Sequence, residues 1–193
     1  MDSVKKFINF DLKVACEIGV WKPDYLHLKD IINPEIQFIL VEANKDCCKE
    51  LELRYNLPNF KIYNFAIADQ SGSIKLYNRS KEPDASAFIE GLPYSPATIN
   101  DHYKINEKDI KICEGITFDK IDPGNIDLLC LDIEGAEWFA LKHMKSMPKI
   151  ITIEMHGVGY KNPYSKEIKD WMSKNKYEPI FYGQNDIFYL RTI

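Results

Sequence analysis

The chain has 193 residues, which is the size of one domain with a sizeable core. Its 45% hydrophobic and 28% charged residues are typical of a folded protein, and its net charge of -4 argues against a nucleic-acid backbone as the main partner. No run of about 18 apolar residues exists, so no membrane span is expected. Residues 1–10 also lack the apolar stretch of a signal peptide.

The five cysteines form no CxxC pair. Cys16 and Cys130 lie inside apolar runs, and Cys47 and Cys48 are adjacent in a predicted helix. This odd number and these positions are typical of free thiols in a reducing compartment. We therefore expect a cytoplasmic protein without a disulfide framework or a zinc site.

Five apolar, largely aliphatic runs predict strands, and helix-like stretches separate them. The strands are expected at residues 13–18, 35–42, 60–67, 126–132 and 149–155, and the helices at residues 23–32, 45–55, 137–144 and 165–175. Nearly continuous apolar runs are typical of strands buried on both faces, as in a parallel sheet. The alternation of strand and helix predicts a doubly wound α/β fold in a single domain over residues 1–193.

Three segments break the alternation. A turn at residues 69–72 predicts a hairpin between residues 60–67 and 73–78, and a second turn predicts a C-terminal hairpin of residues 177–182 and 187–190. Residues 79–109 show no clear period and predict a long loop, which in a compact domain is usually functional.

Acidic residues gather where the predicted strands end. In an open α/β sheet, ligands bind at the carboxyl ends of the strands. Glu42, at the end of the second strand, has the position and chemistry to accept hydrogen bonds from two adjacent ribose hydroxyls. The alternative is a solvated loop acid, or an acid that stabilises the N-terminus of the next helix.

The first strand ends in Glu17-Ile18-Gly19. Glycine allows close approach of the backbone to a ligand. The following residues do not form the G-x-G-x-x-G pattern of dinucleotide sites, so a pyrophosphate cradle is not expected. A nucleoside cofactor without phosphate fits this loop better.

Several longer motifs carry a family resemblance. They are CEIG at 16–19, FILVEAN at 38–44, NFAIAD at 64–69, ITFDKI at 116–121, IDLLCLDIEGAEWFALKHM at 126–144 and PKIITIEMHG at 148–157. With these motifs the sequence resembles the FkbM-type family of S-adenosylmethionine-dependent methyltransferases. The resemblance implies a seven-stranded, Rossmann-like methyltransferase sheet, S-adenosylmethionine as cofactor, and O-methylation of a sugar or small-metabolite hydroxyl.

The resemblance also implies roles for individual residues. Glu17 and Gly19 would lie beside the methionine portion of the cofactor, Glu42 on the ribose, Ala43 and Asn44 near the adenine, and Phe65 and Ala66 along the adenine slot. Asp132 would face the reacting centre. Ser86 resembles part of the family's loop over that centre. His102, from its place in the 79–109 loop, and Glu134 are further candidates for contact with the acceptor.

Two arrangements remain open for the chemistry. His156 could act as a general base oriented by Asp132 or Glu154. Alternatively, Asp132, Glu154 and His156 could hold a divalent ion such as magnesium. We also consider a homo-oligomer, since a domain with few extra elements can borrow a neighbour to cover its acceptor site.

The chain departs from the family pattern at one position. Pro23 stands where a second glycine is usual, and proline fixes φ and removes a donor. This keeps a non-catalytic S-adenosylmethionine-binding module of the same fold as an alternative. A nicotinamide-dependent oxidoreductase is the other alternative, and the missing G-x-G-x-x-G counts against it.

Overall fold

The computed structural model describes residues 4–79, 87–89, 105–155 and 161–192. Its main feature is a seven-stranded sheet with the strand order β10-β11-β9-β8-β1-β2-β3. The strands are β1 (Val14–Ile18), β2 (Gln37–Val41), β3 (Phe60–Tyr63), β8 (Leu128–Leu131), β9 (Ile150–Glu154), β10 (Tyr177–Tyr182) and β11 (Asp186–Arg191). The pairs from β3 to β9 are parallel, and β11 is antiparallel to both β9 and β10. This confirms the mostly parallel sheet and the antiparallel C-terminal hairpin.

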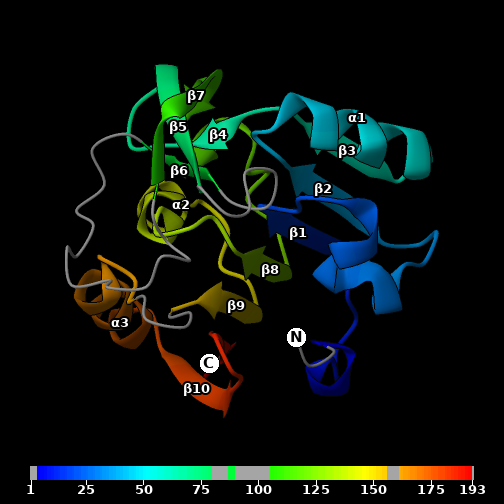
Figure 1. The fold of residues 1–193 in the computed structure, drawn as a ribbon. Coiled ribbons are helices and arrows are strands. Elements are labelled where there is room, and N and C mark those ends of the chain that lie inside the picture. The colour runs from blue at the N-terminus through cyan, green and yellow to red at the C-terminus, as the bar shows by residue number, and fades with distance from the viewer. Residues whose placement is uncertain (1–3, 80–86, 90–104, 156–160, 193) are drawn as a thin grey trace.

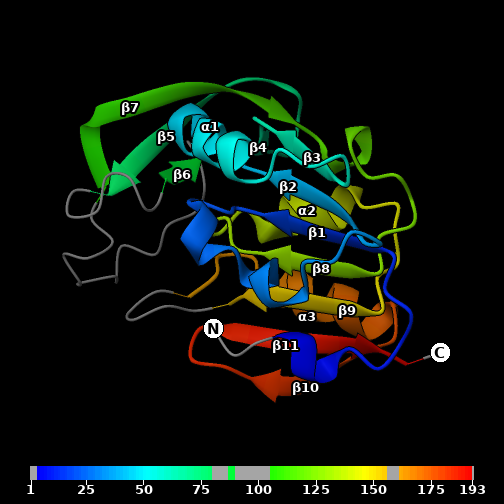
Figure 2. The same cartoon turned by 90° about the vertical axis from the view of Figure 1, so that its right-hand side faces the viewer.

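Helices and short turns cover both faces of this sheet (Figures 1 and 2). On one face, α2 (Glu137–His143), α3 (Ser165–Lys174) and η5 (Phe118–Lys120) pack on the strands. On the other face lie α1 (Lys45–Arg54) and the 3-10 turns η1 (Val4–Phe7) and η3 (His27–Ile31). Because 3-10 turns stand where a doubly wound sheet would have regular helices, we describe the fold as a mostly parallel α/β sheet.

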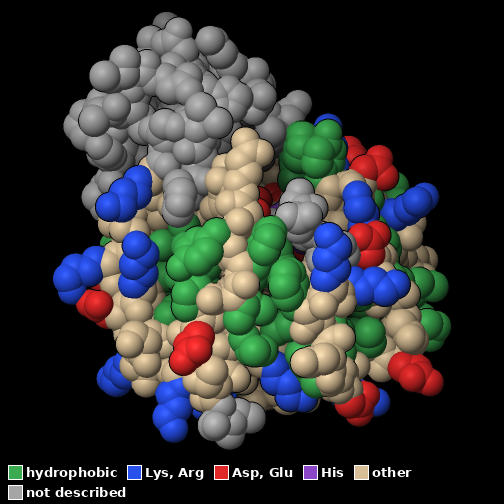
Figure 3. Space-filling model, turned by 90° about the horizontal axis from the view of Figure 1, so that it is seen from below, with side chains coloured by type: hydrophobic (Ala, Val, Ile, Leu, Met, Phe, Trp, Pro, Cys, Tyr) green, Lys and Arg blue, Asp and Glu red, His purple; other side chains and the backbone are tan. Residues whose placement is uncertain are grey.

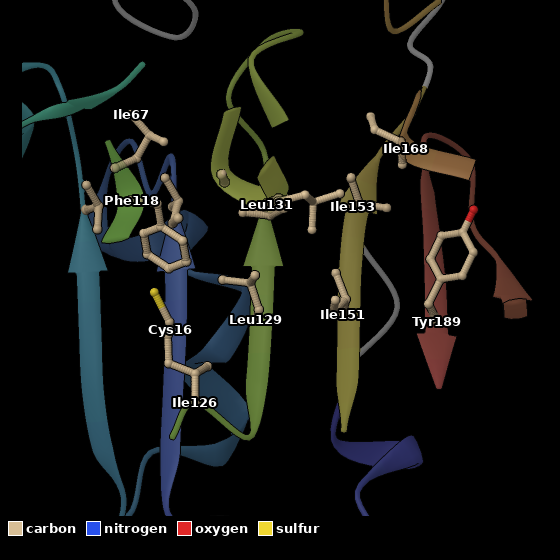
Figure 4. Packing of buried hydrophobic residues seen from close by; sticks show 14 of the residues in the cluster. Cys16, Ile67, Phe118, Ile126, Leu129, Leu131, Ile151, Ile153, Ile168 and Tyr189 are labelled. Atoms are coloured by element: carbon tan, nitrogen blue, oxygen red, sulfur yellow. The ribbon is translucent and has the colours of Figure 1, made fainter. Parts of the chain in front are cut away.

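The central strands hold the core. Every residue of β1, β8 and β9 is buried, and their side chains alternate between the two hydrophobic clusters. Figure 4 shows the cluster under α2 and α3, with Leu129, Leu131, Ile151 and Ile153 side by side. Full burial of one such side chain stabilises the fold by about 1.5–3 kcal/mol. The continuous apolar runs therefore form the central strands, which are buried on both faces.

The predicted helix at residues 23–32 is wrong. The segment forms two 3-10 turns, η2 (Pro23–Tyr25) and η3, because Leu26 between them has non-helical backbone angles (φ -52, ψ 118). The backbone N–H groups of His27 and Leu28 bind the Glu17 carboxylate instead of a preceding turn of helix. The side chain of a central strand therefore overrides the local helical pattern.

A second sheet has the strand order β4-β7-β5-β6. Its strands are β4 (Ala66–Ile67), β5 (Gly72–Arg79), β6 (Ala87–Ile89) and β7 (Ile105–Ile116). The sheet lies beside β3 and reaches past the carboxyl ends of the parallel strands (Figure 2).

This second sheet corrects three predictions. Residues 60–67 are two strands, β3 and β4, in different sheets. The predicted hairpin of residues 60–67 with 73–78 does not form, because β7 lies between β4 and β5 and pairs with both. The predicted loop at residues 79–109 contains β6 and the start of β7. In each case a partner distant in the sequence decides the pairing, which local patterns do not reveal.

Edge strand β10 lies on the side of the molecule that Figure 3 presents, where hydrophobic side chains lie among lysines and arginines. Ile180 and Tyr182 of β10 are exposed. Pro179 has no N–H to offer a further strand, which is a usual feature of sheet edges.

All five cysteines are free thiols. Among the described residues, no helix has the length and apolarity to cross a membrane.

Candidate functional site

The ends of four parallel strands are aligned. Ile18 pairs with both Val41 and Leu131, and Leu131 pairs with Ile153. The residues that end or follow these strands, Gly19, Glu42, Asp132 and Glu154, therefore meet at one edge. We call this edge the carboxyl edge.

Gly19 brings two strand ends into direct contact. Its φ is +85°, and a Cβ atom placed on it would lie 1.8 Å from the backbone oxygen of Asp132. Its N–H donates to the Val41 carbonyl at 2.9 Å. Only glycine fits this left-handed and crowded position. In the structure this glycine allows close contact with the Asp132 backbone, and the predicted approach to a ligand stays a prediction.

Glu42 is almost fully buried at the carboxyl edge. Its Oε2 accepts the backbone N–H of Trp21 at 2.7 Å, and its Oε1 accepts the backbone N–H of Asn44 at 2.6 Å. Burial raises the pKa of Glu42, while these N–H groups and the Lys111 ammonium lower it. A carboxylate has about four acceptor positions, and the Ala43 N–H also bonds to Glu42, so at least one position remains for a ligand hydroxyl.

Asn44 follows Glu42 and begins the next helix. Its side-chain oxygen accepts the Asp46 N–H at 3.1 Å, which confirms Asn44 as the N-cap of α1. Ala43 lies between these two residues. Asn64, which sequence reasoning did not identify, donates to the carbonyl oxygens of Glu42 and Ala43 at 2.8 and 3.1 Å and fixes the backbone of this segment.

Trp21 is a second residue that sequence reasoning did not identify. It has a φ of +57°, unusual for a bulky residue, and this geometry aims its N–H at Glu42. Its ring packs on Tyr25 with 4.2 Å between centroids. Pro23 occupies the first position of η2, where no N–H is needed, and its carbonyl accepts the Tyr55 hydroxyl at 3.1 Å. The loop thus accommodates the proline.

Glu17 has no exposed surface. Its Oε1 accepts the His27 N–H at 3.0 Å and its Oε2 the Leu28 N–H at 3.1 Å. Burial raises the pKa of Glu17 to about 8 and lowers the pKa of the neighbouring His27 to about 4. The structure gives Glu17 a role that the sequence did not suggest. Its carboxylate anchors η3 next to the loop of residues 19–22.

Three carboxylates, Asp132, Glu134 and Glu154, form an acidic cluster at the carboxyl edge. One oxygen atom from each lies within 4.8 Å of the others. Burial is the main cause that raises the pKa of Asp132 and of Glu154, and the negative charges of Glu134 and Glu137 raise both further. A hydrogen bond between the two carboxyl groups lowers the pKa of Asp132 and raises that of Glu154. Glu134 has a left-handed φ of +53° in the turn that follows β8.

Glu137 lies just behind this cluster and stabilises the start of α2. Its Oε1 accepts the N–H groups of Ile133 and Gly135 at 2.9 and 3.2 Å. Its Oε2 accepts Nδ2 of Asn162 at 2.5 Å. Burial raises the pKa of Glu137 to about 7. Glu137 therefore holds the turn of residues 133–135 that leads into α2.

The remaining predicted residues divide into two groups. Ala66 is buried in β4, and Phe65 is partly buried with its ring stacked against Tyr63, so both lie near the end of β3. Ser86, His102 and His156 lie outside the described residues, and their predicted roles stay predictions.

A groove of about 460 Å³ lies elsewhere, at the amino ends of the strands. Residues just before β1 and β2, including Asp11, Lys13 and Glu35, line it together with Lys5 and Phe10. Because ligands of open α/β sheets bind at the opposite edge, this groove does not coincide with the candidate site.

The fold has known relatives among solved structures. An FkbM methyltransferase from Methylobacillus flagellatus superimposes with a TM-score of 0.60 at 12% identity, over 96% of this chain and 45% of that one. The chain thus spans less than half of that protein. The pyocyanin biosynthetic protein PhzM (TM-score 0.46, 9% identity, 98% and 53% coverage) and a SAM-dependent methyltransferase from Aquifex aeolicus (0.47, 9%, 96% and 85%) are more distant.

No curated protein matches the chain significantly. A family model described as the methyltransferase FkbM domain matches residues 17–179, which run from the end of β1 through the acidic cluster to the first residues of β10. The chain belongs to the FkbM methyltransferase domain family.

Proposed function

We propose that this chain transfers a methyl group from S-adenosylmethionine to a hydroxyl oxygen of a sugar or small metabolite. The observation that carries the proposal is the meeting of Gly19, Glu42 and Asp132 at the carboxyl edge. A nucleoside with a sulfonium group fits this edge for three reasons. The loop after β1 has no pyrophosphate motif, Glu42 suits a ribose, and carboxylates lie beside the expected reacting centre.

The residues suit the parts of this cofactor. Glu42 would accept the ribose hydroxyls on its remaining lone pairs, with Trp21 and Asn44 holding its carboxylate in place. Ala43, Asn44, Phe65 and Ala66 would border the adenine. Gly19 would approach the methionine portion with its backbone. Glu17, with both oxygens engaged by η3, supports this loop as a positioning residue.

S-adenosylmethionine supplies a methyl carbon that its sulfonium has already activated. The chain then has to align the acceptor, which can contribute about 7–11 kcal/mol to lowering the barrier, and remove the hydroxyl proton. Asp132 and Glu154, at the carboxyl edge, would face the acceptor oxygen, either as proton acceptors or as ligands of a cation that lowers the pKa of the hydroxyl. His156 remains an alternative base, with the same two acids to orient it.

Calorimetry and an acceptor panel test the proposal. We expect S-adenosylmethionine and S-adenosylhomocysteine to bind, and methyl label to appear in sugar or small-metabolite hydroxyl compounds. Binding of NAD in their place would contradict the proposal and favour the oxidoreductase. Binding of S-adenosylmethionine without turnover on any acceptor would favour a non-catalytic module.

A further inference from the structure

The acidic cluster concentrates charge in a buried place. Asp132 follows β8, Glu154 ends β9 and Glu134 lies in the turn between β8 and α2. Among the described residues, the charged groups that shift the pKa of Asp132 and Glu154 are all carboxylates, including Glu137 and Asp186 behind the cluster. Like charges at such spacing repel strongly in a partly desolvated site unless a cation or a proton offsets them.

Glu154 provides a second and independent observation. The residue is 8% exposed, and its Oε2 is buried without a hydrogen-bond partner in the described part of the chain. A buried polar atom left without a partner costs about 1–3 kcal/mol, and more when it carries charge. The Glu154 carboxyl group shares a hydrogen bond with Asp132 and contributes one oxygen to the cluster, so a cation that binds there would displace the shared proton and give Oε2 a partner.

We propose that Asp132, Glu134 and Glu154 bind one divalent cation of the Mg²⁺, Mn²⁺ or Ca²⁺ class. These hard cations take carboxylate oxygens, at about 2.1 Å for Mg²⁺ and about 2.3–2.6 Å for Ca²⁺. Two oxygens on opposite sides of one ion are then about 4.2–5.2 Å apart. The spacing of up to 4.8 Å in the cluster falls in this range.

This set of ligands differs from the set that the sequence suggested, because Glu134 takes the place of His156. Three monodentate carboxylates leave about three positions of an octahedral ion for water or an acceptor oxygen. In the methyl transfer proposed above, on which this role rests, a coordinated acceptor hydroxyl would have a lowered pKa and would release its proton to water. The carboxylates then act as ligands and not as the base.

The test is a titration of the chelator-treated full chain with Mn²⁺ alone, in which the electron paramagnetic resonance signal reports free Mn²⁺. We expect about one bound Mn²⁺ per chain, displaced by Mg²⁺ or Ca²⁺. Glu134→Gln and Glu154→Gln should each weaken binding at least about tenfold. Glu178→Gln, on the exposed strand β10, removes the same charge away from the cluster and should leave binding unchanged.

Thermal unfolding of the same variants checks that each chain is folded. Mn²⁺ should raise the unfolding temperature of the wild type and of Glu178→Gln, but not of the cluster variants. Lack of saturable Mn²⁺ binding to the folded wild type would overturn the cation site, as would binding that both cluster substitutions leave intact.

Calorimetry with S-adenosylhomocysteine, run on the same preparations, separates the two proposals. Mn²⁺ binding without nucleoside binding supports the cation site and contradicts the methyl transfer. Nucleoside binding without Mn²⁺ binding overturns the cation site alone.

Discussion

Gly19 and Gly124 have nearly the same left-handed backbone, with φ of +85° and +84°, but different surroundings. A Cβ on Gly124 meets nothing within 4 Å, whereas one on Gly19 meets the Asp132 backbone at 1.8 Å. We expect Gly124→Ala to lower the free energy of unfolding by about 1–2 kcal/mol, the cost of the left-handed conformation. Gly19→Ala should lower it by more than about 3 kcal/mol, because steric overlap adds to this strain. Urea denaturation measures both.

The pair of alanine variants isolates the contact with Asp132 from the backbone conformation. Equal losses in the two variants would show that the approach of Gly19 to Asp132 does not constrain the loop. Calorimetry on the folded fraction should also show weaker S-adenosylhomocysteine binding in Gly19→Ala and unchanged binding in Gly124→Ala.

Glu42 is expected to hold the ribose. Glu42→Ala should weaken S-adenosylhomocysteine binding by about 1.5–3 kcal/mol for each hydrogen bond lost, which is about tenfold or more in Kd. Glu42→Gln keeps the shape and one acceptor oxygen and should lose less. Calorimetry gives the Kd of each variant.

Glu35→Ala is the matched control, since Glu35 is an exposed acid just before the other end of β2. An unchanged Kd in Glu42→Ala would show that this carboxylate does not contact the cofactor. Its backbone partners Trp21 and Asn44 also lose their acceptor in this variant, so its free energy of unfolding must be measured beside the Kd.

At the scale of elements, Asn162 connects three segments. Its Nδ2 donates to Glu137 at the start of α2 and, at 3.4 Å, to the carbonyl of Glu154 in β9, and its Oδ1 accepts the Tyr164 N–H before α3. We expect Asn162→Ala to lower the free energy of unfolding by about 1–3 kcal/mol, because the buried Glu137 oxygen loses its donor. Denaturant unfolding monitored by circular dichroism measures the loss.

Asn175→Ala serves for comparison. Asn175 is only partly buried and makes a single side-chain bond, to the Trp171 carbonyl at the end of α3. It should lose about 0.5–1.5 kcal/mol. A loss in Asn162→Ala no greater than this would contradict the connecting role.

The elements also show what local sequence determines. Strands β1, β2, β8 and β9 were predicted because continuous apolar runs suit burial on both faces, and α1 because Asn44 marks its start. The turn at residues 69–72 exists, but the partner of β5 is β7. Gly72 of β5 pairs with Gly115 of β7, which is distant in the sequence. Such pairing depends on the whole chain and leaves no periodic signal near the turn.

The candidate site was predictable to a similar degree. Glu42, Asp132 and Glu154 meet as the strand ends implied, because register follows from parallel pairing. The backbone of Trp21 at positive φ and the capture of η3 by Glu17 were not predictable. The first depends on an unusual backbone conformation, and the second depends on a contact between residues in different elements.

At the scale of the whole molecule, buried acids dominate the response to pH. Burial raises the pKa of Glu17 to about 8 and of Glu137 to about 7, above an ordinary value of 4.5. The folded state therefore binds more protons than the unfolded state between pH 4.5 and 8, so the free energy of unfolding should fall as pH rises through this window. Urea unfolding at a series of pH values measures the slope.

Glu137→Gln should reduce this slope between pH 4.5 and 7, whatever its effect on the absolute stability. Asp69 acts in the opposite direction at lower pH, because its bonds to Lys142 and His143 lower its pKa and are lost on acidification. Stability that rises steadily from pH 4.5 to 8 would contradict the assignment of raised pKa values to the buried acids.

The position of β1 has a consequence for how the chain folds. This strand lies between β2 and β8, and the bond from the Lys13 N–H to the Asp127 carboxylate closes a separation of 114 positions. Folding with such distant contacts is slow, since chain entropy is lost before the contacts form. A nascent chain that ends before β8 would present β1 as an unpaired apolar edge, so truncated fragments should aggregate and not form a smaller domain.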